Sequence, residues 1–191
     1  LRSREAGDEF NHYWAASLWL DAREGARDFT IRGAYLNGEL SRVDENNGAD
    51  WNYWHYTLEA ALYVPVVDEH NVFAGYARWD RMDGENVPFY KLPGLGMGRY
   101  SLSHVLDQKG MRGIWENEYV DRNRFLSSVE YRHRVKGNWI PESWGEANMP
   151  FDLDLPRFIR NMAWHGWLDM GQVWPDDEEF EDVKYAYGIG A

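Results

Sequence analysis

Apolar and polar residues alternate along much of the chain with a period of two, which predicts β-strands rather than helices. In residues 51–67 the even positions from Trp54 to Val64 are apolar, and His55, Thr57 and Glu59 lie between them. Comparable runs occur at 13–21, 29–37, 71–80, 124–136, 161–174 and 183–190. The pattern predicts about seven strands, several near the roughly 9–11 residues that a tilted strand needs to cross a bilayer.

Each run has an apolar side and a polar side. In residues 29–37 the apolar side is expected at Phe29, Ile31 and Tyr35, and in 161–174 at Trp164, Leu168 and Met170. Full charges occupy the polar side of residues 124–136, which holds Arg124, Ser128, Glu130, Arg132, Arg134 and Lys136. A soluble sandwich produces this alternation by burying one face of each sheet. A membrane barrel produces it by turning apolar side chains to lipid and charged ones to the lumen.

The connections between these runs differ in length. Residues 22–27 and 68–69 form short turns. Long, polar connections are expected at 44–50, 82–123, 137–160 and 175–182. Short turns that alternate with long loops are typical of outer-membrane barrels, whose long loops lie outside the cell.

Aromatic residues make up 16% of the chain, with 11 Trp and 12 Tyr. Such residues gather at membrane interfaces, but they also suit a soluble β-domain that binds carbohydrate. No window approaches the roughly 18 consecutive apolar residues of a membrane helix, and the mean hydropathy is −0.67. Composition therefore excludes a helical membrane protein and leaves both β-architectures open.

The charge and the chain ends restrict partners and context. The net charge of −12 argues against a nucleic-acid partner, and the absence of Cys excludes disulfides and thiolate metal sites. Residues 1–10 are polar and charged and do not resemble a signal peptide. Residues 185–191 stop within a strand-like pattern. We therefore expect a piece of a longer protein, with any export signal upstream.

No catalytic or metal-binding pattern stands out. Glu130 and Asp169 could serve as a glycosidase-type carboxylate pair, although nothing in their local spacing supports this. The six His lack metal-ligand spacing, and the acidic runs 176–179 and 181–182 are interpreted as solvated loop rather than a Ca²⁺ site. The sequence has no P-loop or serine nucleophile elbow, and the glycines at 94, 96 and 98 lack a strand-to-helix context. We predict no enzymatic activity, no metal and no cofactor.

The most informative stretch runs from Val87 to Val135. It contains, in order, Pro88-Phe89-Tyr90, Leu92-Pro93, Leu95-Gly96, Met111-Arg112-Gly113-Ile114, Asp121-Arg122-Asn123 and Glu130-Tyr131-Arg132. Residues 167–174 (WLDMGQVW) and 187–190 (YGIG) follow. In this order the motifs resemble the C-terminal barrel region of BamA/TamA-type proteins, the bacterial surface antigen family. Ile114 departs from the family pattern, which has an aromatic residue at that position.

The resemblance implies an all-β fold, an antiparallel transmembrane β-barrel of which residues 1–191 form a part, without a periplasmic domain. It implies a loop at about 83–123 that folds into the lumen. In that loop the motif Met111, Arg112, Gly113 and Ile114 would bring Arg112 to Glu130 and Asp169. Arginine has a planar fork that suits carboxylates. On the residues alone, Arg112 would instead be interpreted as an exposed loop charge and Glu130 as a carboxylate on a strand surface.

The resemblance also implies a function: the insertion or translocation of proteins at the outer membrane of Gram-negative bacteria. Expected partners are outer-membrane lipid and lipopolysaccharide, client outer-membrane proteins, and accessory periplasmic or lipoprotein subunits. Three other functions stay open. The chain could belong to a passive porin-like or structural barrel, to the barrel anchor of a larger fused protein, or to a soluble aromatic-rich sandwich that binds sugars.

Overall fold

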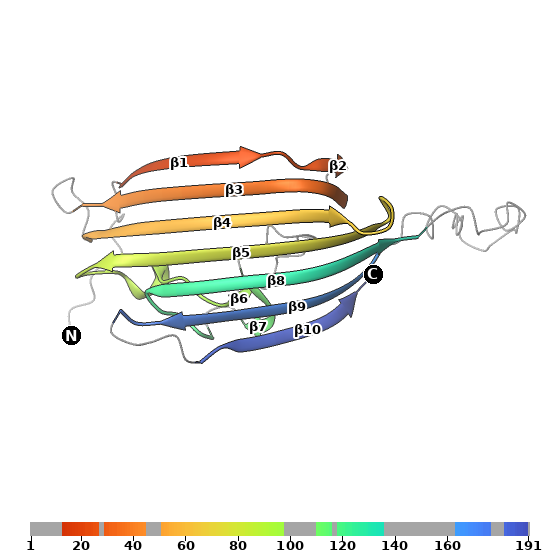
Figure 1. The fold of residues 1–191 in the computed structure, drawn as a ribbon. Coiled ribbons are helices and arrows are strands. Elements are labelled where there is room, and N and C mark those ends of the chain that lie inside the picture. Colours follow the sequence, from red (N-terminus) through yellow and green to blue (C-terminus); the bar gives the residue numbers. More distant parts are fainter. Residues whose placement is uncertain are drawn as a thin grey trace, which may run out of the picture.

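The structure is a computed structural model and is described here for residues 13–26, 29–44, 51–97, 110–115, 118–135, 163–176 and 182–190. Within these ranges one antiparallel sheet dominates the chain (Figure 1). Its strands, in spatial order, are β1 (Tyr13–Asp21), β3 (Phe29–Val43), β4 (Tyr53–Pro65), β5 (Asn71–Gly84), β8 (Asn123–Arg134), β9 (Ala163–Trp174) and β10 (Lys184–Gly190). The short strand β2 (Glu24–Ala26) pairs with the beginning of β3. The predicted all-β antiparallel fold is confirmed.

The connection between β5 and β8 contains further structure. A 3-10 turn at Phe89–Lys91 is followed by β6 (Gly96–Met97), which pairs in parallel with β7 (Met111–Trp115). β6 and β7 lie against one face of the sheet, over β8 to β10 (Figure 1). No helix in the described ranges is long and apolar enough to cross a membrane.

The two faces of the sheet differ sharply in chemistry. The register places Gly38, Leu58, Trp79 and Phe125 in one row across four strands. On this outer face large apolar side chains are exposed, among them Leu58 at 54%, Leu62 at 55% and Val129 at 51%. On the opposite, inner face, charged side chains are buried: Asp80, Arg124, Glu130, Arg132 and Asp169. A soluble sandwich would show the reverse, because it buries apolar side chains and exposes charges.

The prediction for residues 29–37 was wrong in two respects. The strand continues to Val43, because its second half pairs in unbroken register with β4. Phe29, Ile31 and Tyr35 lie on the inner face, not on the apolar outer face. They pack into a cluster with buried Tyr63 and Val72. The outer face of β3 is carried instead by even positions such as Leu36, which is 52% exposed.

The predicted alternation of short turns and long loops also fails at one place. Neighbouring antiparallel strands connect at alternating ends of the sheet, so β1–β3, β4–β5 and β8–β9 all connect at one end. We call this the turn end, and the opposite end, near Val43 and Tyr53, the loop end. The long connection predicted at 137–160 lies outside the described residues, but it joins Arg134 to Ala163 at the turn end.

Candidate functional site

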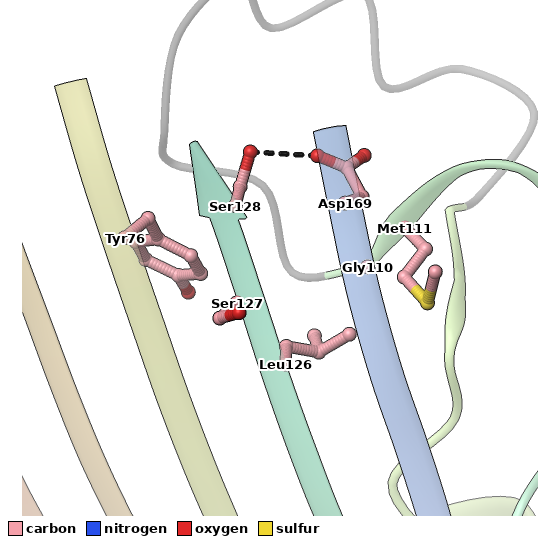
Figure 2. A pocket seen from close by; sticks show the side chains of 7 residues that line it. All are labelled: Tyr76, Gly110, Met111, Leu126, Ser127, Ser128 and Asp169. Atoms are coloured by element: carbon pink, nitrogen blue, oxygen red, sulfur yellow. Dashed lines mark hydrogen bonds between the residues drawn. The ribbon is translucent and has the colours of Figure 1, made fainter. Parts of the chain in front are cut away.

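Three side chains on the inner faces of β8 and β9 form the floor of the site. Ser128 and Glu130 are two residues apart on β8 and therefore point to the same face of the sheet. The β8–β9 register places Asp169 directly beside Ser128. The Ser128 hydroxyl donates a hydrogen bond of 2.6 Å to Asp169 Oδ1 (Figure 2).

Arg112, on β7, fits onto this floor. Its Nε and Nη2 donate to Asp169 Oδ2 and Oδ1 at 2.9 and 2.6 Å, which makes a bidentate pair. Its Nη1 donates to Glu130 Oε2 at 2.9 Å, and Nη2 also donates to the Ser128 hydroxyl at 2.9 Å. The backbone N–H of Arg112 adds a bond of 3.0 Å to Asp169 Oδ2. A bidentate pair between an arginine and a carboxylate is geometrically specific as well as strong.

An aromatic ring and a second arginine complete the surroundings of the guanidinium. The guanidinium carbon of Arg112 lies 4.1 Å from the centroid of the Trp167 ring, within cation–π range. Arg132 donates from Nε to the other oxygen of Glu130, Oε1, at 2.6 Å. Two arginines thus face two carboxylates, and the cluster is formally neutral. Neutrality and dense hydrogen bonding are what allow charges to remain buried.

Apolar contacts hold the loop beside the ion pairs. Met111 and Leu95, both 1% exposed, form a cluster with Leu126 of β8, and Ile114 packs against its edge. Gly171 of β9 makes room for Met111, since a Cβ there would lie 2.9 Å from the Met111 sulfur. Met111 and Leu126, drawn in Figure 2, line a cavity whose volume is about 10 Å³. That volume holds at most one water molecule.

Gly113 gives β7 its conformation at this point. Its φ of 82° lies in the left-handed region that favours glycine. A side chain here would meet no neighbour within 4 Å, so the requirement for glycine comes from the backbone angle alone.

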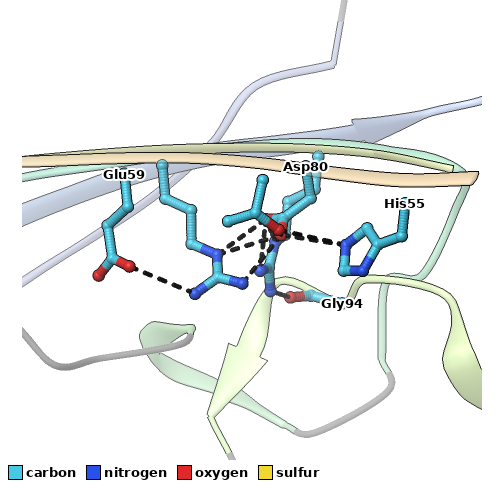
Figure 3. A network of polar contacts seen from close by, with 7 residues as sticks. His55, Glu59, Asp80 and Gly94 are labelled. Atoms are coloured by element: carbon cyan, nitrogen blue, oxygen red, sulfur yellow. Dashed lines mark hydrogen bonds and ion pairs between the residues drawn. The ribbon is translucent and has the colours of Figure 1, made fainter. Parts of the chain in front are cut away.

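A second set of buried charges holds another part of the same loop (Figure 3). Asp80, 1% exposed, accepts hydrogen bonds from Arg124 at 2.6 and 2.9 Å and from Arg78 at 2.9 Å. The Thr57 hydroxyl donates a further bond of 2.9 Å to it. Arg124 Nη1 then donates to the carbonyl oxygen of Gly94 at 2.7 Å. The loop is therefore fixed to the inner face through Gly94 as well as through Arg112.

The structure thus brings Arg112, Glu130 and Asp169 into direct contact and places Met111 and Ile114 in the adjoining apolar cluster. The carboxylates of Glu130 and Asp169 are both engaged by arginine, so the arrangement favours a clamp rather than an acid–base pair. No group of three or more His, Asp or Glu within the described ranges could hold a metal ion.

Sequence reasoning missed the Asp80 network. Asp80 and Arg124 both stand on the polar sides of their predicted strands, and in the structure they are direct register partners. The pairing was hidden because the long loop separates the two strands in the sequence. Gly94 was set aside because its surroundings do not match a nucleotide-binding loop, although its role here is to offer a carbonyl oxygen.

The chain is similar in structure to BamA from Haemophilus ducreyi, as seen in a crystal structure of that protein lacking POTRA domains 1–3. The match has a TM-score of 0.60 at 14% sequence identity, and it covers 93% of this chain and 35% of the BamA chain. This chain therefore spans little more than a third of that structure. No family model matches the chain. At this identity the likeness concerns the fold, which is an antiparallel β-sheet of the BamA barrel type, left open within the described residues.

Proposed function

We propose that this chain is part of an outer-membrane β-barrel that acts in the insertion or translocation of proteins at the outer membrane. In this proposal residues 1–191 supply part of the barrel wall, and residues 83–123 fold inside it. The observation that carries the proposal is the Arg112 clamp, since it joins an inward loop to two neighbouring strands through buried ion pairs.

The outer face supports a position in a membrane. From Trp54 to Val64 on β4, at about 3.3 Å per residue, the apolar band runs about 33 Å along the strand. At a strand tilt near 40° that length spans about 25 Å, the usual height of the apolar band of an outer-membrane barrel. Within the described residues β1 and β10 each pair on one side only. Because unpaired backbone groups are costly in lipid, further strands are needed to close the barrel.

The ion pairs of Arg112 with Glu130 and Asp169 support a functional role for the loop. A barrel that serves only as a passive pore needs an open lumen, whereas here a loop covers the inner faces of β8 and β9. A loop held by several charge-assisted bonds can be fixed in one position without covalent links. We infer that the docked loop keeps this part of the barrel wall in the shape needed for activity on client proteins.

Substitutions of Arg112 in the whole protein, reconstituted in lipid vesicles, test this function. The readout is the rate at which an unfolded outer-membrane protein becomes inserted, followed by its heat-modifiable gel mobility. Arg112→Ala removes every side-chain bond of the clamp and is expected to slow insertion strongly. Arg112→Lys keeps the charge but loses the fork, so its effect should be intermediate.

The matched control is Arg32→Ala, because Arg32 is an exposed arginine on the outer face whose ion pair is with exposed Glu24. It should behave like the unchanged protein. Ion conductance through the barrel together with unchanged client insertion in Arg112→Ala would reject the proposal in favour of a passive porin-like barrel.

A further inference from the structure

We propose that the outer face at the loop end carries a binding site for the phosphate group of an anionic membrane lipid. Arg42 and Arg81 would supply the charge, and Trp14, Trp54 and Tyr56 the aromatic surroundings. The inference rests on the proposed function in one respect, namely that the outer face meets lipid.

The strand register places the two arginines on either side of β4. Arg42 of β3 pairs with Trp54, and Arg81 of β5 pairs with Tyr56, two residues further along the same strand. Trp54, Tyr56 and both arginines therefore share the outer face. Strands lie about 4.8 Å apart, so the two arginine Cα atoms are separated by about 12 Å, and their long side chains can converge on one phosphate.

Aromatic rings form the base of the site. Trp14 of β1 meets Trp54 edge to face with centroids 5.3 Å apart, and Trp54 stacks with Tyr56 at 6.3 Å. The guanidinium carbon of Arg42 lies 5.1 Å from the Trp54 ring centroid. Stacking leaves the N–H groups at the edge of the guanidinium free to donate, which is a geometry that suits phosphate.

Neither arginine is consumed by a strong ion pair. Arg42 approaches Asp44 at only 3.9 Å, too far for a hydrogen bond. Arg81 is exposed and makes no ion pair or hydrogen bond within the part of the chain that the structure describes. The other arginine on the outer face of β3, Arg32 at the turn end, is already matched by Glu24 at 2.6 Å. Available positive charge on these strands thus lies at the loop end.

The position of the site favours a lipid over a soluble anion. The rings lie where the apolar band begins, with exposed Leu58 and Leu62 further along β4. A ligand that contacts both the arginines and the apolar band needs a phosphate and an acyl chain. Tryptophan and tyrosine are typical of the level of the headgroups. Three of the four long connections predicted, 44–50, 82–123 and 175–182, join strands at this end. Long loops of outer-membrane barrels face the cell exterior, so the lipid at this end belongs to the outer leaflet.

The test compares lipids that differ in headgroup, using the whole protein in detergent micelles and native mass spectrometry to count retained lipid. Phosphatidic acid presents a phosphate monoester on acyl chains, phosphatidylcholine a zwitterionic group on the same chains, and inorganic phosphate the anion alone. The unchanged protein is expected to retain phosphatidic acid in preference to phosphatidylcholine. Inorganic phosphate should compete poorly.

Three variants complete the experiment. The double variant Arg42→Gln/Arg81→Gln should weaken phosphatidic acid binding by about tenfold or more, since it removes charge-assisted bonds. Arg32→Gln, the matched control at the turn end, should leave binding unchanged. Asp83→Asn should strengthen binding, because Asp83 pairs with Trp54 on the same face and its charge repels phosphate.

Equal retention of phosphatidic acid by the double variant and by the unchanged protein would overturn the site. Displacement by inorganic phosphate at similar concentration would also overturn it, in favour of a soluble anion.

The client-insertion assay on the same variants separates this inference from the proposed function. If the double variant retains lipid normally while Arg112→Ala still slows insertion strongly, the lipid site alone is wrong. A protein that stays monodisperse without detergent would contradict the proposed function itself.

Discussion

At the residue scale, Glu130 is shared between two arginines. Oε2 accepts from Arg112 and Oε1 accepts from Arg132. Arg132 is only 3% exposed, and its two Nη groups are buried without a hydrogen-bond partner among the described residues. A buried donor that lacks a partner is costly. Arg132 could use those donors on Glu130 if Arg112 withdrew, so the two arginines compete for one carboxylate.

This competition predicts that the loss of Arg132 tightens the loop. In Arg132→Met, Glu130 has Arg112 as its remaining partner, so withdrawal of Arg112 becomes less favourable. The chain has no natural cysteine, and a cysteine placed at position 111 would be covered only while the loop is docked. We expect slower alkylation of that cysteine by a maleimide in Arg132→Met.

The opposite change provides the contrast. Glu130→Gln removes the carboxylate charge from the clamp, so alkylation at position 111 should become faster than in the single-cysteine protein. An equal alkylation rate in Arg132→Met would contradict the competition, and a higher rate would show that Arg132 supports the docked loop.

At the element scale, the reliability of the sequence pattern depends on what covers each face. Residues 53–65 were predicted well because the outer face of β4 is uniformly apolar and its inner face carries His55, Thr57 and Glu59. β3 was misassigned because the inner face is itself apolar near the turn end, where Phe29 packs on Tyr63. Alternation indicates that the two faces differ, and it identifies the outer face only where the inner face is polar.

The candidate site was predictable in part for a related reason. Arg112, Glu130 and Asp169 stand in recognisable motifs, whereas Asp80 and Arg124 do not, although both are buried. Their pairing depends on which strand follows the long loop in the sheet. A single sequence contains no direct signal for which strand pairs with β5, because strand order and register depend on the packing of the whole sheet.

The loop element offers a test of steric fit. Gly171→Ala would place a Cβ 2.9 Å from the Met111 sulfur and from the carbonyl oxygen of Phe125, so β7 should be displaced. We expect increased amide hydrogen exchange across residues 110–115. The matched control is Gly75→Ala, because a Cβ at Gly75 meets nothing within 4 Å. Similar exchange in both variants would contradict the packing of Met111 described above.

At the scale of the whole molecule, the outer face of the sheet is apolar, and the buried charges lie on the inner face. Buried Asp80, Glu130 and Asp169 face buried arginines, while leucines along β3, β4 and β9 are exposed. Exposed leucines in a continuous band mark a surface that contacts something apolar. The open sheet and its likeness to a BamA barrel agree with this interpretation at the level of fold.

A substitution by arginine in the middle of the apolar band of β4 tests whether the outer face contacts lipid or water. Leu58→Arg on the outer face, near the middle of the band from Trp54 to Val64, should destabilise the protein in vesicles by about 2–4 kcal/mol, the cost of a charged side chain near the bilayer midplane. Urea unfolding followed by tryptophan fluorescence measures the change. In an aqueous environment the same substitution at a half-exposed site would have little effect, within about 0.5 kcal/mol. A change that small would argue against a membrane position.

The central claim is that the loop lies inside the barrel, beside β9, in the membrane. Its most direct test is a disulfide between cysteines at positions 112 and 169 of the whole protein in native membranes, detected by a redox-dependent gel shift. The backbone nitrogen of Arg112 is 3.0 Å from a carboxylate oxygen of Asp169, which places position 112 directly beside position 169, and a disulfide forms only when two Cα atoms approach within roughly 7 Å. Efficient cross-linking of 112 with 169, and none between 115 and 169, is the predicted result. Absence of the 112–169 disulfide, while both single variants remain stably in the membrane, would contradict the docked loop.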